Sequence, residues 1–224
     1  MKYPKLRELK EAFTALIKGP YTTKFPKVPS PAAPAYRGKP EFNEEECVVC
    51  GACANVCPAK AIEIVETKNE FPENSEQMKK EDNLQLLPTG IRRMVLHYDV
   101  CIFCGQCETN CLTEKGVHLT QKYDLATLDR KECIVTVEDE LVFCEYCGES
   151  ITTKKHLQWL VERLGPQAFS NPNLFLASYE EIKLLETRIS RKKEAPLERS
   201  DHLRLLCPRC RKQLTLKEEW GTKS

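Results

Sequence analysis

The spacing of its cysteines constrains this chain more than any other feature of the sequence. Eight of the thirteen cysteines form two runs of the pattern C-x2-C-x2-C-x3-C. The runs are Cys47, Cys50, Cys53 and Cys57, then Cys101, Cys104, Cys107 and Cys111. Thiolates at this spacing hold a cubane [4Fe–4S] cluster, and where two such runs occur together the fourth cysteine of each ligates the other cluster. The pattern predicts two clusters that lie close together, and therefore a role in passing electrons.

Crossed ligation divides the eight cysteines into two predicted sets. The first cluster is expected on Cys47, Cys50, Cys53 and Cys111, and the second on Cys101, Cys104, Cys107 and Cys57. Gly51 and Gly105 follow the second cysteine of each run, where the lack of a side chain lets the backbone approach a cluster closely. Zinc binding by some of these cysteines is the alternative, which the repeated tight spacing disfavours.

Composition limits the class of protein. The chain has 224 residues and a net charge of +1, with a mean hydropathy of −0.47. A charge this close to zero gives no indication of nucleic-acid binding, and no apolar run approaches the roughly 20 residues that cross a bilayer. The N-terminal segment is too charged for a secretory signal peptide. Cysteines paired as C-x2-C indicate metal sites rather than disulfides, and a reducing cytoplasm is expected.

Residues 1–40 are predicted to form an amphipathic helix followed by a proline-rich docking arm. Apolar residues recur at helical spacing over 5–18, and Gly19 and Pro20 end the pattern. The apolar positions are Leu6, Leu9, Phe13, Leu16 and Ile17. Because so short a helix is marginal in water, it should pack on its own domain or, as we favour, on a partner subunit or membrane surface. The prolines from 20 to 40 predict an extended arm that serves as a strap or as a plain linker.

Residues 41–125 are expected to form the two-cluster domain, with a ferredoxin-like α+β fold. A short apolar segment follows each cysteine run, at 61–65 and at 117–119, and is predicted to be a strand after a short helix. The polar stretch at 66–90 is interpreted as an insertion that forms a surface loop or hairpin. Residues 92–98 are then predicted to return as a strand.

Residues 126–224 carry a second metal motif. Cys144 with Cys147, and Cys207 with Cys210, are C-x2-C knuckles that together make a closed tetrahedral site, as in zinc ribbons. Four protein ligands leave no open position, so the metal is expected to be structural. Zinc is favoured over a rubredoxin-like single iron, a third iron–sulfur cluster or a site without metal. The long segment between the knuckles is interpreted as a helical insertion in the ribbon.

The other elements of this C-terminal unit are predicted from local patterns. A β-pair is expected at 133–137 and 141–143, and a helix at 152–164. Ser178 with Glu181 resembles a capping box, which predicts a second helix to about residue 191. Cys133 is expected to be a buried, inert thiol. No nucleophile has a recognisable partner, so we predict no catalytic residue.

Several motifs together resemble those of one family. They are Tyr36-Arg37-Gly38-Lys39-Pro40 before the first run, Cys101-Ile102-Phe103-Cys104-Gly105, Tyr123-Asp124-Leu125-Ala126, and Cys207-Pro208-Arg209-Cys210-Arg211-Lys212-Gln213. This set resembles the two-cluster iron–sulfur subunit of formate hydrogenlyase and related group 4 membrane-bound [NiFe] hydrogenases. That subunit is in turn similar to the ferredoxin-like subunit I of respiratory complex I. The departures are the 66–90 insertion and Leu112, which stands where the first run has Pro58.

The resemblance implies an electron relay that is not catalytic alone. It places the chain peripherally on the cytoplasmic face of the cell membrane, between an electron-donor module and the small subunit of a [NiFe] hydrogenase, with the Ni–Fe chemistry in another subunit. The alternatives are the equivalent subunit of a complex I-like quinone or sulfur reductase, and a free-standing polyferredoxin or regulatory iron–sulfur sensor. A DNA-binding sensor should carry a basic helix pair, whereas the helices predicted here are short and mixed in charge.

Overall fold

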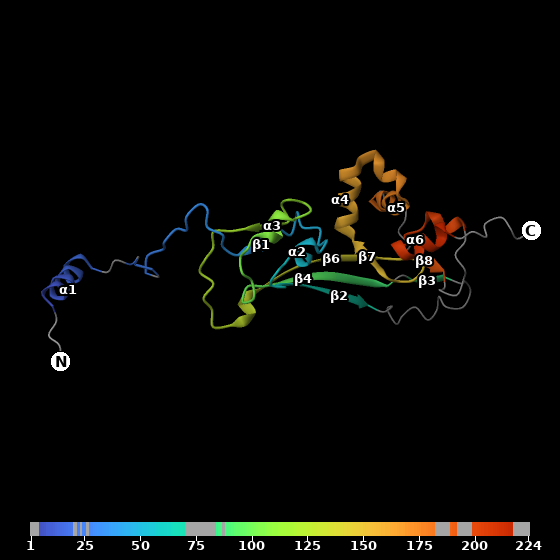
Figure 1. Ribbon diagram of the computed structural model, residues 1–224. Helices are drawn as coiled ribbons and strands as arrows, with labels where there is room; N and C mark the ends of the chain where they lie inside the picture. The colour runs from blue at the N-terminus through green and yellow to red at the C-terminus, as the bar shows by residue number, and fades with distance from the viewer. Residues whose placement is uncertain are drawn as a thin grey trace, which may run out of the picture.

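The computed structural model describes residues 5–19, 22, 24–25, 27–69, 84–86, 88–181, 189–191 and 199–216. Figure 1 shows an elongated molecule, with α1 at one end, the two cysteine runs in the middle and the four-cysteine unit at the other end. Among the described residues, no helix combines the length and the apolar character that crossing a membrane requires.

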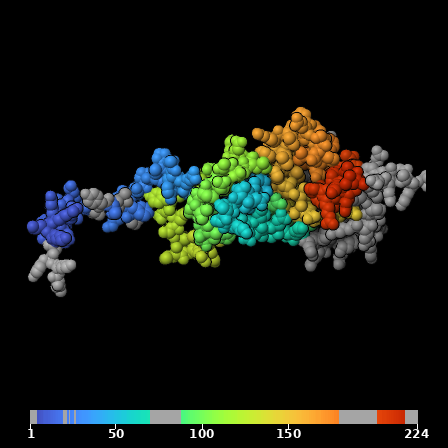
Figure 2. Space-filling view, in the orientation of Figure 1, coloured from blue at the N-terminus to red at the C-terminus, as the bar shows by residue number. Residues whose placement is uncertain are grey.

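The N-terminal helix stands apart from the rest of the chain. Helix α1 (Leu6–Lys18) begins where the Lys5 backbone N–H donates to the Glu8 carboxylate, at 3.1 Å, and it ends before Gly19. None of its residues is buried, and the whole predicted apolar stripe is exposed. The space-filling view shows this helix projecting from the body on a thin arm (Figure 2). The predicted helix is confirmed, and its apolar face has no cover among the described residues.

The arm joins the body just before the first cysteine run. Gly38 N–H donates to the Thr120 carbonyl at 2.8 Å, and Lys39 N–H donates to the Lys122 carbonyl at 3.1 Å. A Cβ at Gly38 would lie 2.4 Å from the Lys122 carbonyl oxygen, so only glycine allows this approach. The arm therefore pairs with the chain that follows the second run.

Two strand pairs and two short helices form the part that holds the runs. Strand β1 (Pro40–Phe42) pairs antiparallel with β5 (Val117–Leu119), and β2 (Ile62–Asn69) pairs antiparallel with β4 (Thr89–His97). Helix α2 (Ala52–Asn55) lies within the first run, and α3 (Gln106–Thr109) lies within the second. The mixture of helix and sheet confirms the α+β class.

The polar insertion extends the hairpin formed by β2 and β4. These two strands pair from Ile62 with Leu96 to Asn69 with Thr89. Beyond them, β3 (Leu84–Leu86) pairs antiparallel with β8 (Ile189–Arg191). Residues 70–83 and 87 of the predicted insertion lie outside the described residues. The strand predicted at 92–98 is confirmed as β4.

The main sheet runs on into the C-terminal part of the chain. Its strand order is β2-β4-β6-β7, with β6 (Ile134–Phe143) paired antiparallel to β4 and β7 (Ser150–Thr153) paired to β6. The sheet thus crosses residue 125, where the sequence analysis divides the chain. The predicted β-pair at 133–143 is wrong, because β6 is one strand through these residues. The ladder with β4 continues through the polar middle of β6, where Arg93 stands opposite Glu138 and pairs with it at 2.7 Å.

Helices cover the far end of this sheet. After η2 (Arg130–Cys133) and the two strands come α4 (Lys154–Leu164), η3 (Gly165–Ser170), α5 (Pro172–Glu181), η4 (Arg199–Leu203) and α6 (Pro208–Thr215). Leu157 on α4, Leu174 and Ala177 on α5, and Leu205 pack with Val142 of β6 in one buried cluster. Apolar burial therefore joins this helical unit to the sheet.

The first predicted C-terminal helix is confirmed as α4, and the second starts earlier than predicted. Helix α5 begins at Pro172, where the Asn171 side chain accepts from the Asn173 N–H at 3.0 Å. The Ser178 hydroxyl instead donates to the Phe175 carbonyl, as a residue inside a helix does. Residues 182–188 lie outside the described residues, and 189–191 form β8, so a helix to residue 191 is wrong.

Candidate iron–sulfur and metal sites

One cavity is lined by four cysteines drawn from both runs. Three of them, Cys47, Cys50 and Cys53, come from the loop before α2 and from its first turn, and Cys111 follows α3. The cavity holds about 280 Å³ free of protein atoms, part of it open to solvent. Its other walls are mainly apolar and include Phe42, Met94 and Val117. We call this the first site.

A second cavity has the same construction with the runs exchanged. Cys101, Cys104 and Cys107 come from the loop before α3 and from its first turn, and Cys57 follows α2. The cavity holds about 360 Å³ free of protein atoms, and Pro40, Ile62, Leu96 and Leu119 form much of its apolar wall. The structure thus brings together the same two sets of four cysteines that crossed ligation predicts. We call this the second site.

The central strand serves both sites. Met94 and Leu96 are two residues apart on β4, so their side chains stand on the same face of the sheet. Both side chains are almost fully buried; Met94 lines the first site and Leu96 lines the second. The Cys53 and Met94 sulfurs are 3.8 Å apart. One strand therefore supplies an apolar floor to both cavities and holds them side by side.

The two cysteine loops share an unusual backbone. Val49 and Gly51 have φ of +50° and +85°, and the matching Phe103 and Gly105 have φ of +53° and +79°. Left-handed conformation strains a β-branched residue such as Val49 and persists only where the surroundings enforce it. Such turns direct successive backbone N–H groups into a concavity that favours anions. In the second run, the Phe103 N–H donates to the Cys101 sulfur at 3.4 Å.

Burial sets the protonation of the cavity thiols. It raises the pKa of Cys53 to about 12 and that of Cys107 to about 11, because an anion in an apolar wall loses its hydration. Such thiols become thiolates only when a cation displaces the proton. Soft thiolate donors in a dry pocket are the ligands that iron–sulfur clusters take. The donor set and the cavity walls of both sites therefore fit [4Fe–4S] clusters.

A third group of thiols lies at the far end of the sheet. The Cys144, Cys147, Cys207 and Cys210 sulfurs all lie within 4.8 Å of one another, and none is in a disulfide. The Cys147 and Cys207 sulfurs are 3.6 Å apart. Four sulfurs at about 2.3 Å from one tetrahedral zinc stand roughly 3.8 Å apart. The spacing therefore fits a single ion, since the thiolates of a cubane cluster must stand further apart.

The two knuckles of this group come from different kinds of element. The turn between β6 and β7 supplies Cys144 and Cys147, and it closes where the Gly148 N–H donates to the Cys144 carbonyl at 2.9 Å. Cys207 precedes α6, and Cys210 lies in its first turn. The Glu145 N–H donates to the Leu205 carbonyl at 2.8 Å, which ties one knuckle to the other.

Two polar residues that had no predicted role of their own, Arg211 and Asn173, fix the second knuckle. Arg211 donates to the carbonyls of His202 and Arg204, at 2.8 and 2.7 Å, and to the Asn173 side chain at 2.6 Å. Asn173 in turn bonds both the N–H and the carbonyl of Leu206. The position of Arg211, directly after the last cysteine, is the sequence signal that could have indicated its role at the knuckle. Asn173 lies on α5, and nothing in the sequence around it indicates such a role.

Cys133 stands outside all three groups. It is half-buried and packs against the core beneath the cluster sites, and its carbonyl accepts from the Tyr98 N–H at 2.8 Å. It is therefore less buried than the sequence analysis expects, because it ends η2 at the edge of the sheet. Its contacts give it a packing role.

Comparison with known proteins agrees with this construction. Residues 46–115 match the family described as 4Fe-4S dicluster domain, so the chain contains such a domain. Subunit I of the NAD(P)H-quinone oxidoreductase of Gloeobacter violaceus is 32% identical over 120 residues, which are 54% of this chain and 50% of that protein. Formate hydrogenlyase subunit 6 of Escherichia coli is 28% identical over 163 residues, 72% of this chain and 79% of that protein.

One solved structure is also similar in sequence. A chain of the membrane-bound sulfane sulfur reductase, an archaeal respiratory membrane complex, is 26% identical over 59% of this chain, with a TM-score of 0.34. The present chain spans about half the length of the Gloeobacter subunit. The resemblance stated from the sequence motifs is confirmed, since both kinds of relative that it names are found.

Proposed function

We propose that this chain is an electron-transfer subunit that relays electrons through two [4Fe–4S] clusters inside a membrane-associated, hydrogenase-type complex. The observation that carries the proposal is the pair of cavities, each lined by four cysteines drawn from both runs. The similarity to formate hydrogenlyase subunit 6 over 72% of the chain supports the type of complex. The equivalent subunit of a quinone or sulfur reductase uses the same relay, and the partner subunits distinguish the two.

The ligand assignment that we propose places the clusters next to each other. Cys53 and Cys57 are four residues apart along α2 and its end, about 6 Å in helical rise, yet they line different cavities. Cys107 and Cys111 repeat this arrangement around α3. Bound clusters supply one-electron chemistry, each moving between its 2+ and 1+ states. The chain's own part is to exclude water, to fix the thiolates and to donate backbone N–H groups to their sulfurs.

The chain carries electrons and leaves the chemistry of the substrate to other subunits. In the part of the chain that the structure describes, the three thiol groups account for twelve cysteines, and each set of four is closed by protein ligands. A closed set offers no coordination position to a substrate. We therefore assign this protein no catalytic residue.

The four-cysteine group is proposed to hold a structural Zn²⁺, within a ribbon that contains a helical insertion. The mutual spacing of its sulfurs supports a single tetrahedral ion, and the two knuckles that meet there are those of a ribbon. The charge of four thiolates on a divalent ion is −2, and the neighbouring Arg211 offsets part of it. A single iron is the alternative, which metal analysis separates from zinc.

Helix α1 is proposed to dock on a partner subunit at the cytoplasmic face of the membrane, with the arm as its strap. Its apolar stripe is exposed, and the arm carries it away from the body (Figures 1 and 2). A helix of 13 residues has little stability in water without a surface to cover its apolar side. The chain would thus be a peripheral subunit, between an electron-donor module and the hydrogenase small subunit.

Anaerobic purification of the complex from its native source, with metal analysis, tests the proposal. We expect about eight irons and one zinc per chain, in an assembly that contains nickel and gives two [4Fe–4S] EPR signals. Removal of residues 1–35 should release the chain from the assembly while both signals remain. A stable monomer that exchanges electrons freely in solution would contradict the complex-subunit function and favour a free-standing ferredoxin.

A further inference from the structure

The loop of the first site lies beneath the C-terminal unit, whereas the loop of the second site is open. Val49, between the first two cysteines of its run, is 0% exposed, and Val48 is also buried. Ile102, which matches Val48 in the second run, is 62% exposed. The two loops have the same backbone conformation, so this difference comes from what covers them. The cover is the junction between β7 and α4.

Thr153, at this junction, is wholly buried, and its hydroxyl donates to the Val48 carbonyl at 2.6 Å. Thr153 is the residue that precedes α4, where a threonine side chain ordinarily accepts from the first turn of the helix. Here Asp139 of β6 caps the helix instead, because its carboxylate accepts from the Lys155 N–H at 2.9 Å. The Thr153 hydroxyl therefore bonds the loop of the first site and not its own helix.

The carbonyl of Val48 and the N–H of Val49 belong to one peptide group. That N–H matches the Phe103 N–H of the second loop, which donates to the Cys101 sulfur at 3.4 Å, and the two loops have the same backbone conformation. The matched conformation directs the Val49 N–H toward the Cys47 sulfur, so one peptide group connects the Thr153 hydroxyl with a sulfur of the first site. A bond at one end of a peptide group polarises the group and strengthens the bond at the other end. It also fixes the plane of the peptide that holds Val49 in its strained conformation.

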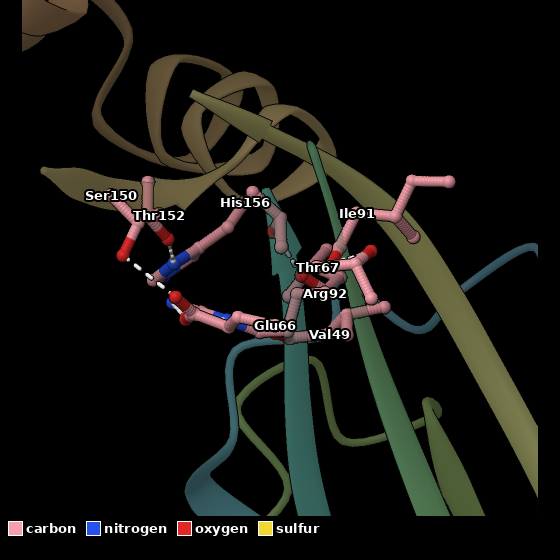
Figure 3. A network of polar contacts seen from close by, with 10 residues as sticks. Val49, Glu66, Thr67, Ile91, Arg92, Ser150, Thr152 and His156 are labelled. Carbon is pink, nitrogen blue, oxygen red and sulfur yellow. Dashed lines mark hydrogen bonds and ion pairs between the residues drawn. The ribbon is translucent and has the colours of Figure 1, made fainter. Parts of the chain in front are cut away.

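Further contacts from the same direction hold this loop. Arg92 of β4 donates to the Val49 carbonyl at 3.5 Å and pairs with Glu66 at 2.7 Å, and the Ser150 hydroxyl of β7 donates to Glu66 at 2.8 Å. Figure 3 shows these side chains converging with Thr152 and His156 between the strands and α4. Lys155 of α4 also reaches the Glu44 carbonyl, at 3.0 Å. The C-terminal unit therefore contacts this part of the chain directly at two carbonyls, those of Val48 and Glu44, and indirectly through Ser150 and the Glu66–Arg92 pair.

We propose that Thr153 is a positioning residue for the first cluster, which acts through the Val48–Val49 peptide on the Cys47 sulfur and raises the reduction potential of that cluster. The reduced cluster carries one more negative charge than the oxidised one, so a stronger N–H bond to its ligand sulfur favours reduction. The inference rests on the proposed ligation of the first site. It gives the C-terminal unit a part in tuning electron transfer, in addition to its own metal.

The test compares Thr153→Val, which keeps the shape and removes the hydroxyl, with Thr153→Ser, which keeps the hydroxyl. Thr152→Val is the matched control, since that hydroxyl contacts His156 at 2.7 Å instead. EPR-monitored redox titration of the assembled complex measures both potentials, and Cys111→Ser identifies the signal of the first cluster. In Thr153→Val we expect the reduction equilibrium of the first cluster to fall by up to about tenfold, equivalent to about 59 mV for one electron.

The second cluster should keep its potential in every variant, and Thr153→Ser and Thr152→Val should match the wild type. Equal shifts of both clusters in Thr153→Val, or no shift of either, would overturn the proposal. If that variant does not assemble, Thr153→Ala removes the same hydroxyl with a smaller side chain, and it should give the same selective shift. Absence of two [4Fe–4S] signals in the wild type would instead refute the proposed function, which keeps the two failures distinct.

Discussion

The two cluster loops are nearly identical in backbone and opposite in environment. Both place left-handed residues at the same two positions, and both are followed by a short helix that presents the third cysteine. The first loop is buried under the β7–α4 junction, whereas the second is half-buried with Ile102 exposed, and it receives a bond from Arg37 of the arm, at 3.3 Å to the Cys104 carbonyl. Cysteine spacing therefore determines the backbone of each loop, whereas segments distant in the sequence determine how far the loop is exposed to solvent.

The largest effect should come from removing the fourth cysteine of one run, because we expect the cluster of the other run to be lost. Cys57→Ser should remove or convert the cluster of the second site, although Cys57 belongs to the first run, and Cys111→Ser should do the same to the first site. Each variant should lose one EPR signal and up to about four irons per chain. Cys133→Ser is the control and should keep both signals. Loss of the cluster in the same run as the substitution would break the crossed assignment.

Removal of the four-cysteine metal should affect the two loops unequally. If the four-cysteine group holds the proposed zinc, Cys207→Ala should abolish its binding and unfold much of the C-terminal unit, because structural zinc contributes on the order of 10 kcal/mol to small domains that depend on it. Zinc content and limited proteolysis between α4 and α6 measure this outcome. Hydrogen exchange should then rise at 47–50 more than at 101–104, because only the first loop lies under that unit. An equal rise in both loops would show that burial does not distinguish them.

A pair of arginine substitutions compares the two loops with smaller changes. Arg92→Met should lower the free energy of unfolding by about 1–3 kcal/mol, because it removes the donor to the Val49 carbonyl and leaves the Glu66 carboxylate with the Ser150 hydroxyl but without its cation. Arg37→Met, on the exposed loop, should change it by no more than about 0.5 kcal/mol. Denaturant unfolding under anaerobic conditions measures both. Similar losses in the two variants would contradict the difference in environment.

The smallest expected effect is a pH dependence of the free energy of unfolding that comes from His156, which lies near the first loop and, in the described part of the chain, has no counterpart at the second. Burial, and then the charge of Arg92, lower the pKa of His156 below its usual 6.5. The unfolded chain therefore binds a proton more readily than the folded chain, so stability is full above pH 6.5 and falls as the pH drops toward the folded pKa. The slope should not exceed about 1.4 kcal/mol per pH unit. His156→Gln should flatten it below pH 6.5, and an unchanged slope would assign the effect to another group.

Much of the candidate site could be predicted from the sequence because thiol chemistry and loop geometry are local. The two runs, the grouping of the knuckle cysteines, α1 and β4 all follow from spacing or periodicity within a few residues. The errors have a different origin. The polar residues 138–140 break the apparent pattern of β6, and the strand is continuous because its backbone ladder with β4 runs unbroken through them. The start of α5 depends on Asn171, whereas the sequence offered a capping pattern at Ser178, seven residues later.

The spacing of the cysteines was enough to predict which thiols this protein groups together. Only the tertiary structure decided how the bound groups differ, because that depends on contacts between segments far apart in the chain. Thr153 reaches Val48 across 105 residues, and no periodicity or motif connects the two. The pairing of β6 with β4 creates that contact by bringing the C-terminal unit over one loop and leaving the other open. Desolvation and hydrogen bonding are properties of that arrangement in space, which local sequence cannot encode.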